Sequence, residues 1–254
     1  GRGRLPAQPA IPHRRWRSDS TPGAIPLNET GVLTSMVSIE IVSDIVCPWC
    51  FIGLRRLDLA IAQVRQEIPD FSCEKRWRPF FLNPDTPPEG EPYLPFLEKK
   101  FGGPAPVEAL FERVRAAGRP YGLEYAFEKI ARRANTLQAH RLIHWAQQRG
   151  DAERLVERLF VAQFQRGEAV GDPGVLVGIA AECGYPAATV ADYLASNEDV
   201  DTVRAMEAEV RAAGISMVPT FVVDRKMVVV GAEDPAILAG AIRQVLAEQG
   251  ETAA

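Results

Sequence analysis

Near the start of the chain, the spacing of apolar residues changes from a strand pattern to a helical pattern. Residues 37–43 form a largely apolar run, which predicts a strand. From Pro48 the apolar positions recur at helical spacing, and the helix predicted over residues 48–68 stops before Pro69. Residues 71–81 alternate in part and predict a second strand. Strand, helix and strand in this order predict a βαβ unit with a right-handed crossover.

The middle of the chain has helical spacing. Prolines crowd residues 83–95, which predicts a loop leaving the first unit. Residues 96–213 are predicted to be helical throughout, without a repeat period. Six helices are predicted. The first begins at Pro106, the second spans residues 136–149, and the third follows a cap at Asp151. The fourth begins at Asp172-Pro173, the fifth spans residues 187–195, and the sixth ends at Gly214.

Strand spacing returns near the end of the chain. Residues 219–223 and 227–230 flank a short turn and predict a hairpin, and Asp234-Pro235 predicts the start of a terminal amphipathic helix. The full order is β-α-β, a helical insertion and β-β-α, which predicts an α/β fold.

The sequence predicts two domains and an N-terminal leader. Residues 36–83 and 214–250 are predicted to form one domain, and residues 84–213 an inserted helical domain. Residues 1–35 are rich in proline and arginine and have no apolar period, which predicts a disordered leader. The natural folded protein is expected to start near Met36. The alternative is an organelle transit peptide, because the leader is Arg-rich and acid-poor. The leader lacks the apolar core of a secretory signal, so export is not expected.

Composition and charge restrict the possible partners. The 254 residues are 46% hydrophobic and 24% charged, with a net charge of −4, which is typical of a soluble globular protein. This mild acidity gives no reason to expect nucleic acid or an anionic membrane as a partner. No apolar run is long enough to span a bilayer.

The four cysteines contain one close pair, which is not a disulfide framework. Cys73 and Cys183 are single and far apart, and we expect both to be reduced thiols in the core. Reduced thiols fit a reducing cytosol, so a cytoplasmic location is predicted.

The close pair lies in the stretch Cys47-Pro48-Trp49-Cys50, where the first strand meets the first helix. The first turn of a helix has unsatisfied N–H groups and a partial positive charge, which favour the nucleophilic thiolate form of a cysteine. Pro48 suits the first helical position, so Cys47 is expected at the N-cap, exposed and activated. Cys50 lies one turn deeper on the same face, where it can attack a mixed disulfide formed on Cys47. The motif therefore predicts redox chemistry.

Two other interpretations of the cysteine pair compete with this one. In the first, the cysteine pair is half of a zinc site, which needs a second pair of ligands. The remaining cysteines and histidines are not spaced to supply that second pair, so no metal is predicted. A chance pair in a buried helix is the other interpretation, and the preceding strand and Pro48 argue against it.

Several stretches together resemble a known family. They are residues 43–50 (Ser-Asp-Ile-Val-Cys-Pro-Trp-Cys) followed by Ile52-Gly53, residues 135–142 (Asn-Thr-Leu-Gln-Ala-His-Arg-Leu), residues 218–221 (Val-Pro-Thr-Phe) and Gly231-Ala232. Over about residues 37–248 the chain resembles the thioredoxin fold, with a large all-helical insertion like that of the DsbA family. The Asn-Thr…His-Arg stretch resembles the FrnE-like cytosolic branch of that family.

The resemblance implies roles for individual residues. Cys47 would be the attacking cysteine and Cys50 the resolving cysteine. Pro219 would be a cis proline facing the pair, and Val218 would present its backbone to an extended substrate. The further substrate-binding residues implied are Pro48, Trp49 (which would cover the pair), Asn135 and His140, the last two as a wall of the cleft.

Two nearby residues have more than one interpretation. Asp44 either tunes the cysteines or accepts a proton, or it only hydrogen-bonds a strand end. His144 lies four residues after His140 on the same predicted helix, so both could face one side. A metal site there would need two further ligands, and we favour a polar role for His144 at the edge of the helical bundle.

The predicted function is thiol–disulfide exchange on protein or small-thiol substrates. No metal or organic cofactor is needed, although glutathione is a possible thiol co-substrate, and a homodimer is possible. The direction depends on the redox potential of the pair, which the sequence does not give.

One alternative function is a glutathione-dependent isomerase or transferase. The 2-hydroxychromene-2-carboxylate isomerases and kappa-class glutathione transferases resemble the same fold order, and they would act on a small aromatic or polyketide substrate. They typically carry serine where Cys47 stands and have no second cysteine, so the retained pair argues against that chemistry. A non-enzymatic holdase is the other alternative.

Overall fold

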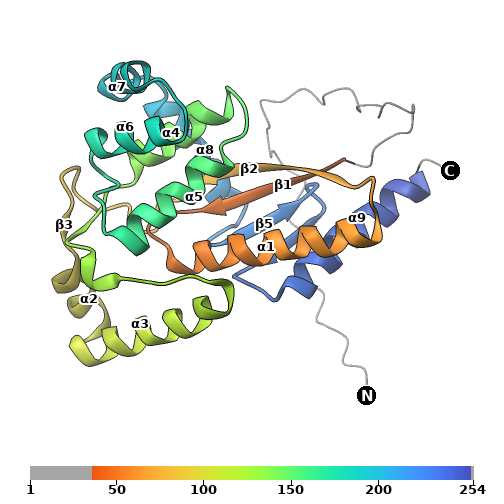
Figure 1. The fold of residues 1–254 in the computed structure, drawn as a ribbon, viewed down its shortest axis with the longest axis horizontal. Coiled ribbons are helices and arrows are strands. Elements are labelled where there is room, and N and C mark those ends of the chain that lie inside the picture. Colours follow the sequence, from red (N-terminus) through yellow and green to blue (C-terminus); the bar gives the residue numbers. More distant parts are fainter. Residues whose placement is uncertain (1–35, 253–254) are drawn as a thin grey trace.

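The computed structural model describes residues 36–252, and the predicted leader lies outside the described residues. A four-stranded sheet in the order β2-β1-β5-β6 forms the centre (Figure 1). The strands are β1 (Met36–Ser43), β2 (Ser72–Pro79), β5 (Thr220–Val223) and β6 (Met227–Val230). β2 runs parallel to β1, whereas β5 is antiparallel to β1 and β6 to β5. This confirms the predicted β-α-β and β-β-α halves.

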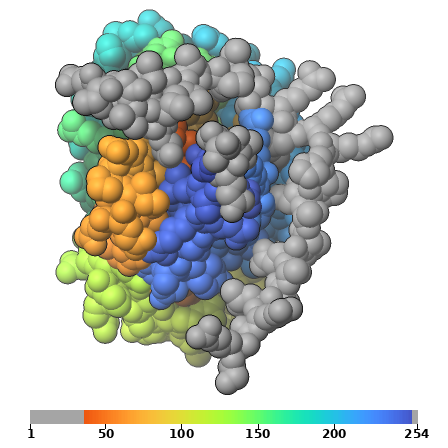
Figure 2. All heavy atoms as spheres, turned by 90° about the vertical axis from the view of Figure 1, so that its right-hand side faces the viewer, coloured from red at the N-terminus to blue at the C-terminus, as the bar shows by residue number. Residues whose placement is uncertain are grey.

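Helices cover both faces of the sheet. On one face α1 (Pro48–Glu67) and α9 (Pro235–Thr252) lie side by side, as Figure 2 shows in orange and blue. Successive residues of β1 point to opposite faces. Ile39 and Ile41 therefore join the main core beneath α1, whereas Val42 packs with Val210 of α8 (Val200–Ala212) on the other face.

The insertion gathers at the end of the sheet where β1 leads into α1 (Figure 1). Besides α8 it contains α2 (Tyr93–Phe101), α3 (Pro104–Gly118), α4 (Leu137–Gln147), α5 (Glu153–Val161), α6 (Pro173–Glu182) and α7 (Ala187–Ala195). Short 3-10 helices span Arg119–Tyr121 and Phe127–Lys129, and α5 continues into a π-helical turn over Ala162–Arg166. The predicted domain boundaries at residues 83/84 and 213/214 stay a proposal.

Three local predictions in the insertion need correction. The segment is not helical throughout, because β3 (Glu91–Pro92) pairs with β4 (Arg132–Arg133), and two-residue strands are too short to show a period in the sequence. α2 begins inside the predicted loop, because prolines in a first helical turn cost no intrahelical hydrogen bond. The N-cap of α5 is Ala152, although the Asp151 carboxylate still accepts a hydrogen bond from the amide of Glu153.

No helix within residues 36–252 is long and apolar enough to cross a bilayer.

Gly53 allows the first half of α1 to approach the segment before β5. A Cβ atom at this position would lie 2.8 Å from Cγ of Pro219 and 3.1 Å from Cζ of Phe221. Both partners are parts of rings, and the proline ring is held in the backbone, so neither yields easily. The absent side chain thus sets how closely the N-terminal turns of α1 approach Pro219.

We expect Gly53→Ala to lower the free energy of unfolding by about 1–3 kcal/mol, because the added methyl group overpacks this contact. Urea unfolding followed by fluorescence measures the change. The matched control is Gly240→Ala in α9, where an added Cβ meets nothing within 4 Å. The control should gain up to about 1 kcal/mol from helix propensity. Equal effects of the two substitutions would contradict the close contact.

Candidate active site

The site begins where β1 ends and α1 starts. After Ser43 the chain makes a tight turn in which the amide of Cys47 donates to the carbonyl of Asp44, at 3.0 Å. Cys47 is the N-cap of α1 with extended backbone angles, and Pro48 occupies the first helical turn. The positions predicted for both residues are confirmed, and they place the Cys47 sulfur at the positive end of the helix.

The segment before β5 forms the opposite wall of the site. The thiol of Cys47 donates a weak hydrogen bond to the carbonyl of Val218, with 3.8 Å between Sγ and the oxygen. The peptide bond between Val218 and Pro219 is cis, as expected from the resemblance. Cys47 and Val218, which are 171 positions apart in the sequence, therefore meet at the first turn of α1.

Both cysteines of the pair are buried. Cys47 is only 4% exposed and Cys50 3%, and both are free thiols. The prediction that Cys47 is exposed is wrong, because Val218 lies against its sulfur and both cysteines belong to the main apolar core. Access from solvent to the Cys47 sulfur therefore requires this cover to move.

The two halves of the pair are electrostatically unequal. Burial raises the pKa of the Cys50 thiol well above its usual range, and hydrogen bonding and charge interaction with Cys47 raise this pKa further. The carboxylate of Asp44 acts in the same direction, while the backbone of Asp44 opposes it. Cys50 is therefore protonated at neutral pH and is not a nucleophile until its proton is removed.

Asp44 and His140 form a buried pair beside the cysteines. Nε2 of His140 lies 3.2 Å from Oδ1 of Asp44, and the backbone amide of Leu82 donates to Oδ2 at 2.8 Å. Asp44 is 1% exposed and His140 5%. A carboxylate only accepts hydrogen bonds, so this contact assigns the ring proton to Nε2. The ring of Phe81 meets the His140 ring edge-on, with 5.5 Å between centroids.

The Asn-Thr…His-Arg stretch connects several parts of the molecule. The side chain of Asn135 donates to the carbonyl of Thr86 at 2.7 Å and accepts from the amide of Leu137 at 3.1 Å. Arg141 is fully buried. Its guanidinium donates to carbonyls at the end of α7, namely those of Tyr193, Leu194, Ser196 and Glu198. These contacts hold the loop after β2 and α7 to α4, and the substrate contact predicted for Asn135 stays a prediction.

Tyr125 is a site residue that the sequence analysis missed. Its hydroxyl donates to the carbonyl of Pro48 at 2.7 Å, and its ring meets Phe51 edge-on. Burial and both cysteines raise the pKa of Tyr125, so its hydroxyl remains a donor. Tyr125 alternates with Leu123 and Phe127 as buried residues, a short period-two signal that the prediction of helix throughout residues 96–213 overlooked. Trp49 is half-buried against the core, with the Arg113 guanidinium 6.0 Å from its ring.

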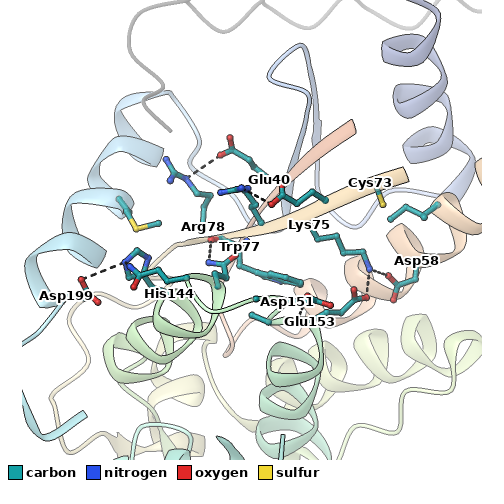
Figure 3. Close-up of a pocket in the computed structure, with 18 of the residues that line it drawn as sticks. Glu40, Asp58, Cys73, Lys75, Trp77, Arg78, His144, Asp151, Glu153 and Asp199 are labelled. Carbon is teal, nitrogen blue, oxygen red and sulfur yellow. Dashed lines mark hydrogen bonds and ion pairs between the residues drawn. The ribbon is translucent and has the colours of Figure 1, made fainter. Parts of the chain in front are cut away.

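A separate cavity of about 1080 Å³ lies along the outer edge of β2 (Figure 3). The side chain of Gln147 pairs with both the amide and the carbonyl of Trp77, as a neighbouring strand would. Lys75 forms ion pairs with Asp58 and Glu153, which joins β2 to α1 and α5. Lys75, Asp58 and Glu153 in this cavity are thus engaged with each other.

His144 lines this second cavity and not the cysteine site. Its Nε2 lies 3.8 Å from a carboxylate oxygen of Asp199, which fits the predicted polar role at the edge of the bundle. Within residues 36–252, no group of three or more His, Cys, Asp or Glu residues is arranged to hold a metal ion. Cys73 lines the same cavity and, like Cys183, is free and half-buried, so neither thiol lies in the core as predicted.

Comparisons with known proteins agree with this architecture. Residues 38–243 match the family model of the DSBA-like thioredoxin domain. A probable DsbA oxidoreductase from Streptomyces coelicolor superposes with a TM-score of 0.75 at 32% identity, covering 84% of this chain and 91% of that chain. The uncharacterized protein YwbO of Bacillus subtilis is 27% identical over 188 residues, which are 74% of this chain and 86% of that protein.

More distant structures share the fold alone. The cytosolic disulfide reductase DsbM of Pseudomonas aeruginosa has a TM-score of 0.56 at 15% identity, covering 85% of this chain and all of that chain, and it is also known with GSH. A 2-hydroxychromene-2-carboxylate isomerase has a TM-score of 0.56 at 14% identity, covering 85% of this chain and 98% of that chain. Both groups were expected as relatives. With its family match, its sheet order and its cysteine pair at the start of α1, the chain belongs to the family of DSBA-like thioredoxin domains.

Proposed function

We propose that this chain is a thiol–disulfide oxidoreductase in which Cys47 attacks and Cys50 resolves. The observation that carries the proposal is the position of Cys47 at the N-cap of α1, 3.8 Å from the carbonyl of Val218, with the protonated Cys50 one turn behind it. In general the N-terminus of a helix favours the nucleophilic form of a cysteine, and the raised pKa of Cys50 keeps the second sulfur unreactive until it is needed.

The exchange has two steps. The Cys47 thiolate attacks one sulfur of a substrate disulfide, forming a mixed disulfide and releasing the other substrate sulfur as a thiolate. Cys50 then loses its proton and attacks the Cys47 sulfur, which forms the Cys47–Cys50 disulfide and releases the second substrate thiolate. Two electrons pass from the protein dithiol to the substrate disulfide, and the reverse sequence donates a disulfide.

The proposed substrates are proteins or small molecules that carry a disulfide or a thiol. An extended substrate would pair with the backbone of Val218 and contact the other residues implied by the resemblance: Pro48, Trp49, Asn135, His140 and Pro219. Glutathione is the proposed thiol that recycles the pair, in line with the GSH complex of DsbM. A cytoplasmic location is proposed on the same analogy, and the homodimer stays a prediction.

The isomerase alternative has only the shared fold in its favour. A glutathione-dependent isomerase has no step for a resolving thiol, whereas this chain keeps Cys50 protonated directly behind Cys47. We therefore favour disulfide exchange.

Cys47→Ser should lower the rate of exchange with oxidised glutathione by at least about 100-fold, because a serine hydroxyl is a weak nucleophile without an activating base. Cys50→Ser should still react once and then retain glutathione on Cys47, which mass spectrometry detects. Cys73→Ser and Cys183→Ser are matched controls and should exchange at the rate of the unsubstituted protein. Unchanged exchange in Cys47→Ser would refute the proposed function.

The reduced protein should lose stability as the pH rises above about 8.5, the ordinary pKa of a cysteine thiol. The pKa of Cys50 is raised in the folded state, so above this pH the unfolded chain binds fewer protons and is favoured. Urea unfolding between pH 7 and 9.5 should therefore show a steeper fall for the reduced protein than for reduced Cys50→Ala. Identical slopes would show that Cys50 is not held in its protonated form by the fold.

A further inference from the structure

The chain joins the two cysteines of the pair through three peptide units, and printed contacts hold each of them.

The outer two units are tied to each other, because the amide of Cys50 donates to the carbonyl of Cys47 at 3.0 Å. The middle unit joins Pro48 to Trp49, and the hydroxyl of Tyr125 donates to its carbonyl oxygen at 2.7 Å. The turn that separates the two sulfurs is therefore held partly by a residue of the insertion.

The ring of Tyr125 has little freedom to move. Tyr125 is 6% exposed, and its ring stacks on Phe127 with 5.3 Å between centroids and meets Phe164 edge-on at 5.4 Å. Gly118 of α3 leaves the space for this ring, since a Cβ atom there would lie 2.6 Å from Cε2 of Tyr125. This packing fixes the direction in which the hydroxyl meets the Pro48 carbonyl.

The Pro48 carbonyl can accept this hydrogen bond and remain part of the helix. A carbonyl oxygen has two lone pairs, so it can accept from a side chain as well as from a helical amide. The ring of Pro48 also fixes the φ angle of the same residue. The middle peptide unit is thus restrained by both the proline ring and Tyr125.

The spacing of the two sulfurs affects the rate of the resolving step. Cys47 and Cys50 are three positions apart and project from the same side of the first turn. Hydrogen bonding with Cys47 is one of the causes that raise the pKa of Cys50, which agrees with a short distance between the two side chains. An intramolecular reaction is fast when its groups are held near their reacting geometry, and it slows when that restraint is lost.

Tyr125 does not act as an acid or a base in this step. Burial raises its pKa, and both cysteines raise it further, so the hydroxyl keeps its proton at neutral pH. This hydroxyl donates to the backbone of Pro48. Its contribution is therefore to geometry.

We propose that Tyr125 is a positioning residue of the exchange reaction, whose hydroxyl holds the Pro48 carbonyl and thereby keeps Cys50 in place for its attack on Cys47. This inference rests on the proposed function and adds a residue of the insertion that acts on the resolving step. The first attack on a substrate needs Cys47 alone, so it does not depend on this restraint. The bonds and electrons of the resolving step are those of the exchange given above, and no further reactant takes part.

Tyr125→Phe removes the hydroxyl and leaves the ring. The experiment is stopped-flow reaction of the reduced protein with oxidised glutathione, with quenched samples analysed by mass spectrometry. It separates the second-order attack by Cys47 from the first-order resolution by Cys50. We expect resolution to slow by about 3–10-fold, in line with the loss of one hydrogen bond, while attack changes less than about twofold. The deficit should be the same at pH 7 and pH 9, because Tyr125 transfers no proton.

Tyr193→Phe is the matched control. Tyr193 is 5% exposed, and its hydroxyl also hydrogen-bonds a backbone carbonyl, that of Arg141 at 3.1 Å. The substitution removes a similar bond between α4 and α7, and it should leave the ratio of resolution to attack unchanged. Gly118→Ala is a second test variant, because its methyl group displaces the Tyr125 ring and retains the hydroxyl. It should also slow resolution and spare attack.

An unchanged ratio of resolution to attack in Tyr125→Phe would overturn the proposal, as would an equal change in Tyr193→Phe or a deficit that varies with pH. If Tyr125→Phe does not fold, Gly118→Ala decides, since slowed resolution with normal attack supports the proposal and an unchanged ratio overturns it. The absence of Cys47-dependent attack in the unsubstituted protein is a different failure, and it would refute the proposed function.

Discussion

The close packing of the first turns of α1 against Val218 and Pro219 is the contact on which the site depends. Gly53 permits it, because any side chain there would overlap the proline ring. It places the Cys47 sulfur between the positive end of a helix and a backbone carbonyl. The same approach accompanies the burial of both cysteines, which are 4% and 3% exposed.

The two thiols are buried alike but occupy different positions in α1. Cys47 is the N-cap residue of α1, whereas Cys50 lies one turn inside, where burial raises its pKa. Asp44 and His140 lie beside the cysteines as a buried hydrogen-bonded pair, with 3.2 Å between Nε2 of His140 and Oδ1 of Asp44.

The insertion does more than cover the sheet. α4 supplies His140 to the site, Asn135 holds the loop that follows β2, and Arg141 binds the end of α7. Tyr125 binds the carbonyl of Pro48 from a segment between helices. In the second cavity, Lys75 with its two carboxylates joins β2 to α1 and α5. The insertion and the sheet therefore share polar contacts as well as an apolar core.

The sequence alone determined the order of elements, the N-cap position of Cys47 and the start of α1 at Pro48, because apolar spacing and helix-end preferences act over a few residues. The resemblance supplied the cis bond before Pro219 and the expectation that His140 lies at the site. Only the tertiary structure decided that Cys47 is buried, that His140 meets Asp44 and that Tyr125 binds Pro48. These contacts join residues 171, 96 and 77 positions apart, and no local pattern encodes which distant side chains a fold brings together.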